Sequence, residues 1–92
     1  MLEIQWTDTD PETGQRRFLL AERFARVWQF QWKLQRRGEW THGLQPTRAI
    51  WEHVLDSLTR RYRRREGVED KDIEQVKKIL AEVIRDEEMR SR

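Results

Sequence analysis

The sequence predicts one α+β domain, in which a three-stranded antiparallel meander is followed by two helices packed on one face of the sheet (β-β-β-α-α). Three observations support this class: apolar and polar residues alternate near the start, a connector with Gly and Pro follows, and the last half carries two apolar stripes at helical spacing. We expect the sheet over about residues 2–37, the connector over 38–46 and helices over about 47–66 and 69–88, within a single domain of residues 1–92.

The composition fits a small folded chain with one core. The 92 residues include five Trp and three Phe, which favour a packed core despite a charged fraction of 39%. Cysteine is absent, which excludes disulfides and thiolate metal sites. The N-terminal segment does not have the pattern of a signal peptide, and no stretch approaches the ~20 apolar residues of a membrane span. We therefore expect a cytoplasmic protein with no membrane partner.

Period-2 alternation is clearest in the third predicted strand. Apolar residues alternate with Gln and Lys from Trp28 to Leu34, and two earlier segments repeat the pattern. All the inward candidates have even numbers, and directly opposed residues of an antiparallel pair share a face. Each turn must then contain an odd number of residues. The register that satisfies both hairpins places Trp6 opposite Phe18, and Phe18 opposite Trp32.

The second turn is the ambiguous part of the meander. The segment Ala21–Arg26 contains no Gly, Asn or Pro, and most of its residues favour helix. A helix from about Phe18 to Trp28 is therefore a competing interpretation, which would remove the polar sheet face. The first turn, Asp8–Gly14, is rich in turn-forming residues and fits a three-residue loop with a Gly bulge.

Two helices are expected in the last half of the chain. The first begins after a candidate N-cap at Thr47 and ends before Gly67, with arginines in its last turn, where the helix dipole favours cations. The second begins at Glu69 or Asp70. Apolar residues recur at helical spacing, as Ile50, Trp51, Val54, Leu55, Leu58 and Tyr62 in the first helix and as Ile73, Val76, Ile79, Leu80, Val83 and Ile84 in the second.

Charge is distributed unevenly along the chain. The net charge is +2, but residues 16–65 hold thirteen bases and four acids, while both ends are acidic. The odd-numbered face of the predicted sheet carries Arg, Gln and Lys, which can hydrogen-bond base edges or neutralise phosphates. The candidate nucleic-acid-binding residues are Arg17, Arg23, Gln29, Gln31, Lys33 and Arg37 on the sheet side, with Arg60, Arg61, Arg64 and Arg65 at the end of the first helix.

Ordinary explanations compete with nucleic-acid binding on both surfaces. A polar sheet face is commonly just solvated, and arginines at a helix end complement the dipole and pair with nearby acids. At the level of fold, the arrangement is similar to the small sheet-plus-helix DNA-reading domains at the N-termini of integrases, an analogy that rests on no shared motif. A helix-turn-helix interpretation of residues 47–84 is poor, because the second helix, which should carry recognition, is acidic.

A second set of residues suggests contact with another protein or with a second copy of the chain. Both outer strands of a three-stranded meander are edges that can pair with a further strand. Trp40 lies in the Gly-flanked connector, where it either covers the edge of the core or anchors a partner. Leu19 and Val27 on the odd face would add apolar contact. The candidate protein-interface residues are Trp40, Leu19 and Val27.

Motifs for catalysis and metal binding are absent from the sequence. The acidic turn at Asp8–Gly14 lacks the Gly and Glu positions of an EF-hand loop. His42 and His53 have no neighbouring nucleophile or ligand pattern. We expect no enzyme activity, cofactor, metal or small-molecule substrate. The best-supported hypothesis is a nucleic-acid-binding module, and the alternative is a protein-interaction or homodimerisation domain that uses the sheet edges.

Overall fold

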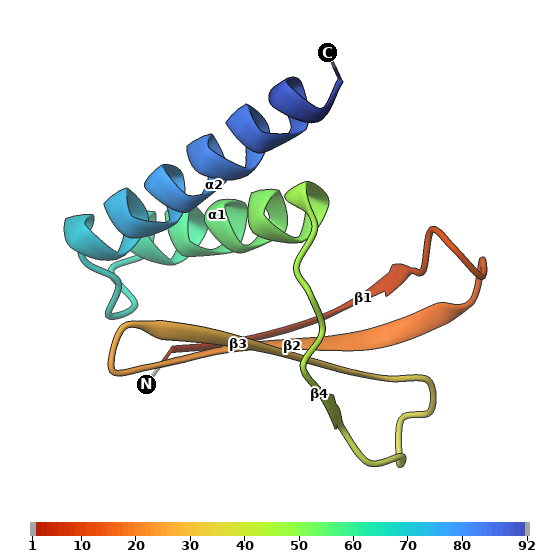
Figure 1. The fold of residues 1–92 in the computed structure, drawn as a ribbon. Coiled ribbons are helices and arrows are strands. Elements are labelled where there is room, and N and C mark those ends of the chain that lie inside the picture. Colours follow the sequence, from red (N-terminus) through yellow and green to blue (C-terminus); the bar gives the residue numbers. More distant parts are fainter. Residues whose placement is uncertain (1, 92) are drawn as a thin grey trace. The chain divides into compact units, whose positions relative to one another are not determined.

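The computed structural model describes residues 2–91 of the chain. The chain divides into two compact units, a sheet unit at Met1–Gln45 and a helical unit at Pro46–Arg92. The elements follow one another in the order β1, β2, β3, β4, α1, α2 (Figure 1). This order confirms the predicted α+β class, with the strands before the helices, and adds a short fourth strand.

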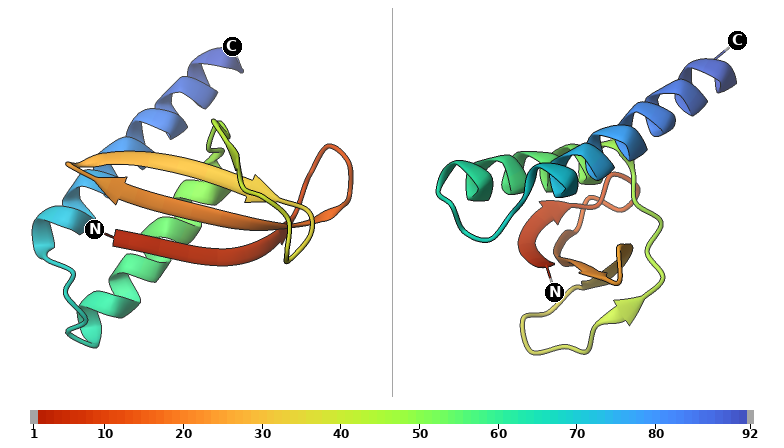
Figure 2. Two further views of the ribbon diagram at one scale, coloured as in Figure 1. Left: turned by 90° about the horizontal axis from the view of Figure 1, so that it is seen from below. Right: turned by 90° about the vertical axis from the view of Figure 1, so that its left-hand side faces the viewer.

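The sheet unit is an antiparallel meander with strand order β1-β2-β3-β4. Its strands are β1 (Leu2–Thr9), β2 (Arg16–Phe24), β3 (Val27–Lys33) and the two-residue β4 (Thr41–His42). Figure 2 shows β1, β2 and β3 side by side. The competing interpretation, a helix from about Phe18 to Trp28, is wrong because both ends of that segment are strands.

The predicted register is wrong by one residue in each hairpin. Leu19, not Phe18, lies opposite Trp6 in β1 and opposite Trp32 in β3. The first turn spans the six residues 10–15 and the second turn only Ala25 and Arg26, so both contain an even number of residues. Because β2 carries apolar residues at both parities from Phe18 to Ala21, its own pattern does not select a face, and the turns decide the register.

The second turn adopts a backbone conformation that its sequence does not favour. Ala25 has φ +50° and Arg26 has φ +65°, and positive values at both central residues define a type I′ turn. This turn matches the right-handed twist of the flanking strands, which is why two-residue hairpins use it despite the steric penalty for residues other than glycine. Local preference for Gly or Asn is therefore overridden by strand pairing.

The register assigns every strand residue to one of two faces. Four strand residues are 5% exposed or less, and all of them lie on the same face of the sheet: Ile4, Leu19, Ala21 and Phe30. We call this the Ile4 face, and it comprises Leu2, Ile4, Trp6, Asp8, Arg17, Leu19, Ala21, Arg23, Trp28, Phe30, Trp32 and Thr41. The opposite surface, the Lys33 face, comprises Glu3, Gln5, Thr7, Thr9, Arg16, Phe18, Leu20, Glu22, Phe24, Val27, Gln29, Gln31, Lys33 and His42.

The segment predicted as a plain connector contains β4. Thr41 pairs with Trp32 and His42 with Gln31, so this strand lines the edge of β3 only at its C-terminal end. The Leu44 amide continues the contact by donating to the Phe30 carbonyl at 3.2 Å. As a result β1 is a full-length edge strand, whereas the edge of β3 is partly covered.

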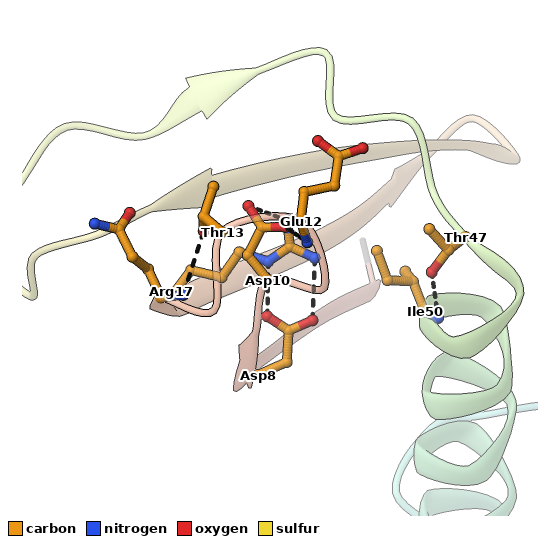
Figure 3. A network of polar contacts seen from close by, with 8 residues as sticks. Asp8, Asp10, Glu12, Thr13, Arg17, Thr47 and Ile50 are labelled. Carbon is orange, nitrogen blue, oxygen red and sulfur yellow. Dashed lines mark hydrogen bonds and ion pairs between the residues drawn. The ribbon is translucent and has the colours of Figure 1, made fainter.

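In the helical unit, α1 (Arg48–Arg63) begins as predicted after Thr47, whose hydroxyl oxygen accepts a hydrogen bond from the Ile50 amide at 3.3 Å (Figure 3). The helix ends before its expected Gly stop. Arg65 has φ +59°, its amide donates to the Tyr62 carbonyl, and the Glu66 amide donates to the Arg61 carbonyl. These two bonds form a Schellman motif with an arginine at the position that usually holds glycine.

The second helix, α2 (Asp70–Arg90), starts with Glu69 as its N-cap and runs two residues past the predicted end at 88. The Glu69 amide donates to the Asp72 carboxylate at 2.9 Å, which satisfies one of the unpaired donors at this end. Asp70 accepts a hydrogen bond from the Tyr62 hydroxyl, and this raises the pKa of Tyr62. Figure 1 shows α1 and α2 side by side. Neither of the two helices described in residues 2–91 has the length and apolar character of a membrane span.

We predict that replacing the second turn by Ala25→Asn and Arg26→Gly raises the free energy of unfolding by about 1 kcal/mol. Residues other than glycine pay roughly 1–2 kcal/mol for a left-handed conformation, and part of the gain is offset by the added freedom of the unfolded chain. Urea denaturation followed by tryptophan fluorescence measures the change.

Gly14→Ala is the matched control with the opposite sign. Gly14 has φ +76°, and a Cβ there would meet no atom within 4 Å, so only the backbone penalty operates. We expect it to lower stability by about 1 kcal/mol. A destabilised turn variant would contradict the type I′ conformation of Ala25 and Arg26.

Candidate nucleic-acid interface

The Lys33 face separates its charges along the strands. Arg16 and Lys33 lie in the rows at one end, beside Thr7 and Phe18, while Glu3 and Glu22 face Gln29 at the other end. Arg16 is exposed and donates from its guanidinium to the Thr7 hydroxyl at 3.3 Å. The face therefore offers a basic end and an acidic end, and the basic end also carries an aromatic ring.

The segment between β3 and β4 brings two further side chains to the basic end. A tight turn, in which the Gly38 amide donates to the Gln35 carbonyl at 2.9 Å, reverses the chain after Lys33. Arg36 and Trp40 then line a pocket of about 400 Å³ together with residues of all three long strands. The lining residues are Gln5, Trp6, Thr7, Phe18, Leu19, Lys33, Arg36 and Trp40.

Lys33 is the centre of this pocket. Its ammonium nitrogen lies 4.4 Å from the ring centroid of Trp40 and 5.9 Å from that of Phe18, and it donates to the Arg36 carbonyl at 2.7 Å. Two cation–π contacts and one hydrogen bond thus hold a half-buried lysine between aromatic side chains from different segments. The site combines flat apolar surfaces with positive charge.

Such a combination suits a planar, anionic ligand. Aromatic rings stack on the faces of nucleobases, and Lys and Arg neutralise the phosphates that connect them. Gln5 and Thr7 add an amide and a hydroxyl to the lining. The Gln5 amide donates to Glu3 at 2.6 Å and the Thr7 hydroxyl accepts from Arg16, and each group has further capacity to hydrogen-bond a base edge.

Three predicted residues of β3 share the Lys33 face as expected, but they differ in exposure. Gln29 is exposed, and Lys33 is half-buried in the pocket. Gln31 is only 7% exposed, and its side-chain amide donates to the Glu22 carboxylate at 2.6 Å. Gln31 is therefore engaged within the sheet, whereas Gln29 and Lys33 present polar atoms at the surface.

The predicted positions of Arg17 and Arg23 on this face are wrong, because the one-residue shift turns both to the Ile4 face. Arg17 is 7% exposed, and its guanidinium donates to both Asp8 carboxylate oxygens at 2.7 and 3.1 Å, with Asp10 at 3.8 Å (Figure 3). Donation of these hydrogen bonds to Asp8 raises the pKa of Arg17. The Arg23 guanidinium lies 5.7 Å from the ring centroid of Trp28.

The remaining predicted bases lie outside the pocket. Arg37 is exposed in the segment between β3 and β4, next to Arg36. In the helical unit, Arg60 pairs with Asp56 at 3.0 Å and Arg64 with Glu66 at 4.0 Å, as the ordinary explanation anticipated. The last turn of α1 and the residues just after it also carry Arg61, which is half-buried, and Arg65, which is exposed.

The three candidate protein-interface residues have separate environments. Leu19 is 1% exposed and belongs to the core, so the predicted surface position is wrong for the same register reason. Val27 is 58% exposed and lies opposite Phe24, which is 75% exposed, at the tip of the second hairpin. Trp40 is half-buried and lines the pocket beneath the Lys33 ammonium.

Several pocket residues were not identified from the sequence. Parity predicts Phe18 in the core, and no sequence pattern points to Gln5, Thr7 or Arg36. The available signal was the run Arg36-Arg37-Gly38-Glu39-Trp40, which places a basic pair and an aromatic residue around a turn directly after a strand. Nothing local indicates that this run folds back onto Phe18.

The acids and histidines form no metal centre among the described residues. Asp8 and Asp10 are engaged by Arg17, and the Asp10 carboxylate also accepts the Glu12 amide at 2.9 Å (Figure 3). These bonds organise the first turn and use the carboxylates that an acidic turn would otherwise offer to a cation.

Comparison with known proteins adds no assignment. No protein-family model, no curated protein and no solved structure matches the chain.

We predict that Arg17→Met lowers the free energy of unfolding by about 1.5–3 kcal/mol, because it removes a buried guanidinium that makes charged hydrogen bonds and leaves Asp8 without them. Arg16→Met is the matched control, since Arg16 is exposed on the other face and its loss should change stability by less than about 0.5 kcal/mol. Equal effects of the two substitutions in urea denaturation would contradict the structural role of Arg17.

Proposed function

We propose that the sheet unit binds single-stranded nucleic acid, with the pocket on the Lys33 face as a base-stacking site. The observation that carries the proposal is the pair of rings around Lys33, with Trp40 and Phe18 centroids at 4.4 and 5.9 Å from its ammonium nitrogen. A base would stack on one of these rings, and Lys33 and Arg36 would meet its phosphates.

The size and placement of the pocket favour a single strand over a duplex. A volume of about 400 Å³ is in the range of sites for single small groups, and it lies among side chains of the sheet and of the segment after β3. Bases of a duplex are stacked on one another and do not offer their faces to protein rings, whereas single-stranded bases do.

Relative magnitudes support displacement of the lysine by a base. A cation–π contact at an exposed site contributes about 0.5–1 kcal/mol. Base–aromatic stacking contributes about 1–3 kcal/mol per base. A stacked base can therefore replace the ammonium at Trp40, and the released Lys33 gains a phosphate as its new partner.

Charge at the rim would extend the binding surface along the strand. Arg16 and Arg37 are exposed at the same end as the pocket, and Gln29 is exposed on the same face. Arg17, Arg23 and Gln31, which were expected to touch the ligand, instead support the sheet in this proposal. Arg61, Arg64 and Arg65 remain a second proposed phosphate-binding segment, in the helical unit, whereas Arg60 is paired with Asp56.

A protein-interaction function is the alternative, and the hairpin tip favours it. Phe24 and Val27 lie opposite one another and are 75% and 58% exposed, a pairing of large apolar side chains that solvent does not favour. The edge strand β1 offers backbone groups for a further strand from another protein or a second copy. Loss of self-association on replacing both tip residues by Ser, with oligonucleotide affinity unchanged, would support this function.

We predict that Trp40→Leu and Phe18→Leu each weaken binding of an oligo-dT or oligo-U of about 12 nucleotides by roughly 5- to 150-fold, the loss expected for one stacked base. Fluorescence anisotropy at low salt measures the affinity, with circular dichroism as the check on folding. Phe24→Leu is the matched control, because it removes an exposed ring from the same face but outside the pocket. Equal affinities for all three variants and the wild type would contradict a stacking site.

We predict that Lys33→Gln combined with Arg36→Gln lowers the slope of log affinity against log salt by about 1.4, since each phosphate contact on a single strand contributes about 0.7. The matched control is Lys77→Gln with Arg85→Gln, which removes two exposed bases of α2. Binding that is absent at low salt, or that does not respond to salt, would overturn the proposed function.

A further inference from the structure

The helical unit carries a groove whose charges change sign along its length. The groove has a volume of about 560 Å³, and α1 supplies Glu52, Leu55, Asp56, Thr59, Arg60 and Arg63 to its wall. These residues recur at intervals of three or four, so they form one face of the helix. The two acids lie in the N-terminal half of this face and the two arginines in the C-terminal half.

The middle of the groove is less polar than its ends. Leu55 and Leu80, the latter from α2, are half-buried there. The Thr59 hydroxyl donates to the Leu55 carbonyl at 2.8 Å, so its hydrogen bond is made within the helix. An apolar centre between charged ends is the usual pattern of a protein interface.

The charges of the groove argue against a polyanion as its occupant. Two carboxylates and two guanidiniums sum to no net charge, and the Asp56 carboxylate already lies 3.0 Å from Arg60. A phosphate backbone would gain from the arginines but would be repelled by Glu52 and Asp56. A partner that matches both halves must itself carry an acidic and a basic segment.

A second copy of the chain has that pattern. When two α1 helices cross antiparallel about a two-fold axis, the acidic half of each meets the basic half of the other, with Glu52 facing Arg63 and Asp56 facing Arg60. Such an interface is isologous, because the same patch serves both partners. The α1 faces also bring Leu55 and Thr59 of each copy together at the axis.

We infer that the chain forms a two-fold dimer through this groove, with α1 of one copy seated antiparallel on α1 of the other. Ion pairs within α1 do not oppose this arrangement. Asp56 pairs with Arg60 and Arg48 with Glu52 on the surface, where side chains are about half exposed and such pairs contribute little. Replacing the ion pairs within α1 by ion pairs between the two copies therefore costs little stability. The dimer also buries the apolar centre of the groove.

Two variants of the full chain test the pairing. In the basic variant, Glu52→Arg and Asp56→Arg make the whole groove positive; in the acidic variant, Arg60→Glu and Arg63→Glu make it negative. Sedimentation velocity over a range of concentrations should show self-association of the wild type and a loss of at least tenfold in dimer affinity for each variant alone. An equimolar mixture of the two variants should restore the dimer as a heterodimer, because only that combination places opposite charges face to face.

The control variant Lys77→Glu changes an exposed charge of α2 outside the groove and should dimerise like the wild type. Circular dichroism establishes whether the variants fold. If the charge-reversed variants do not fold, Leu55→Gln, which leaves every charge in place, takes their place and should also weaken the dimer. A wild type that is monomeric at every concentration overturns the inference. Variants that dimerise alone as well as the wild type, or a mixture that stays monomeric, also overturn it.

Discussion

The two-residue turn at Ala25 and Arg26 determines which side chains share a face of the sheet. With two residues in the turn, Phe24 pairs with Val27, and the same β2–β3 register places Phe18 beside Lys33. The six-residue first turn sets the pairing of β2 with β1, which brings Arg17 beside Asp8. A turn one residue longer would exchange the two faces of β2, bury Phe18, and remove the pocket as it stands.

The pocket combines side chains from paired strands with side chains from the loop between β3 and β4, which is a suitable arrangement for a binding site. Phe18 and Lys33 project from paired strands, whereas Trp40 and Arg36 come from a loop that is tied down by one short turn and by the two residues of β4. The strands therefore set the position of one ring, and the loop sets the position of the other. Binding residues are often placed on loops that a rigid scaffold positions.

Charge along the chain and charge in space have different consequences here. The basic middle of the sequence includes Arg17, which is neutralised within the sheet, and Arg60, which is paired within α1. In the sheet unit, the bases that line the pocket are Lys33 and Arg36, next to aromatic rings. In the α1 groove, the two acids lie in the N-terminal half and the two arginines in the C-terminal half, and this pattern favours a partner of mixed charge over a polyanion.

Local sequence patterns determined the kinds of element and most of their limits. The alternation from Trp28 to Leu34, the cap at Thr47 and the helical stripes are short-range features, and each predicted its element because neighbouring residues alone decide it. The register could not be read this way, since Phe18, Leu19, Leu20 and Ala21 suit either face and the turn holds no glycine to mark it. Only strand pairing decided it, because the strain at Ala25 and Arg26 is offset by the pairing of β2 with β3. The pocket followed from that same pairing and from the return of Trp40 across the sheet, a long-range contact that no local pattern contains.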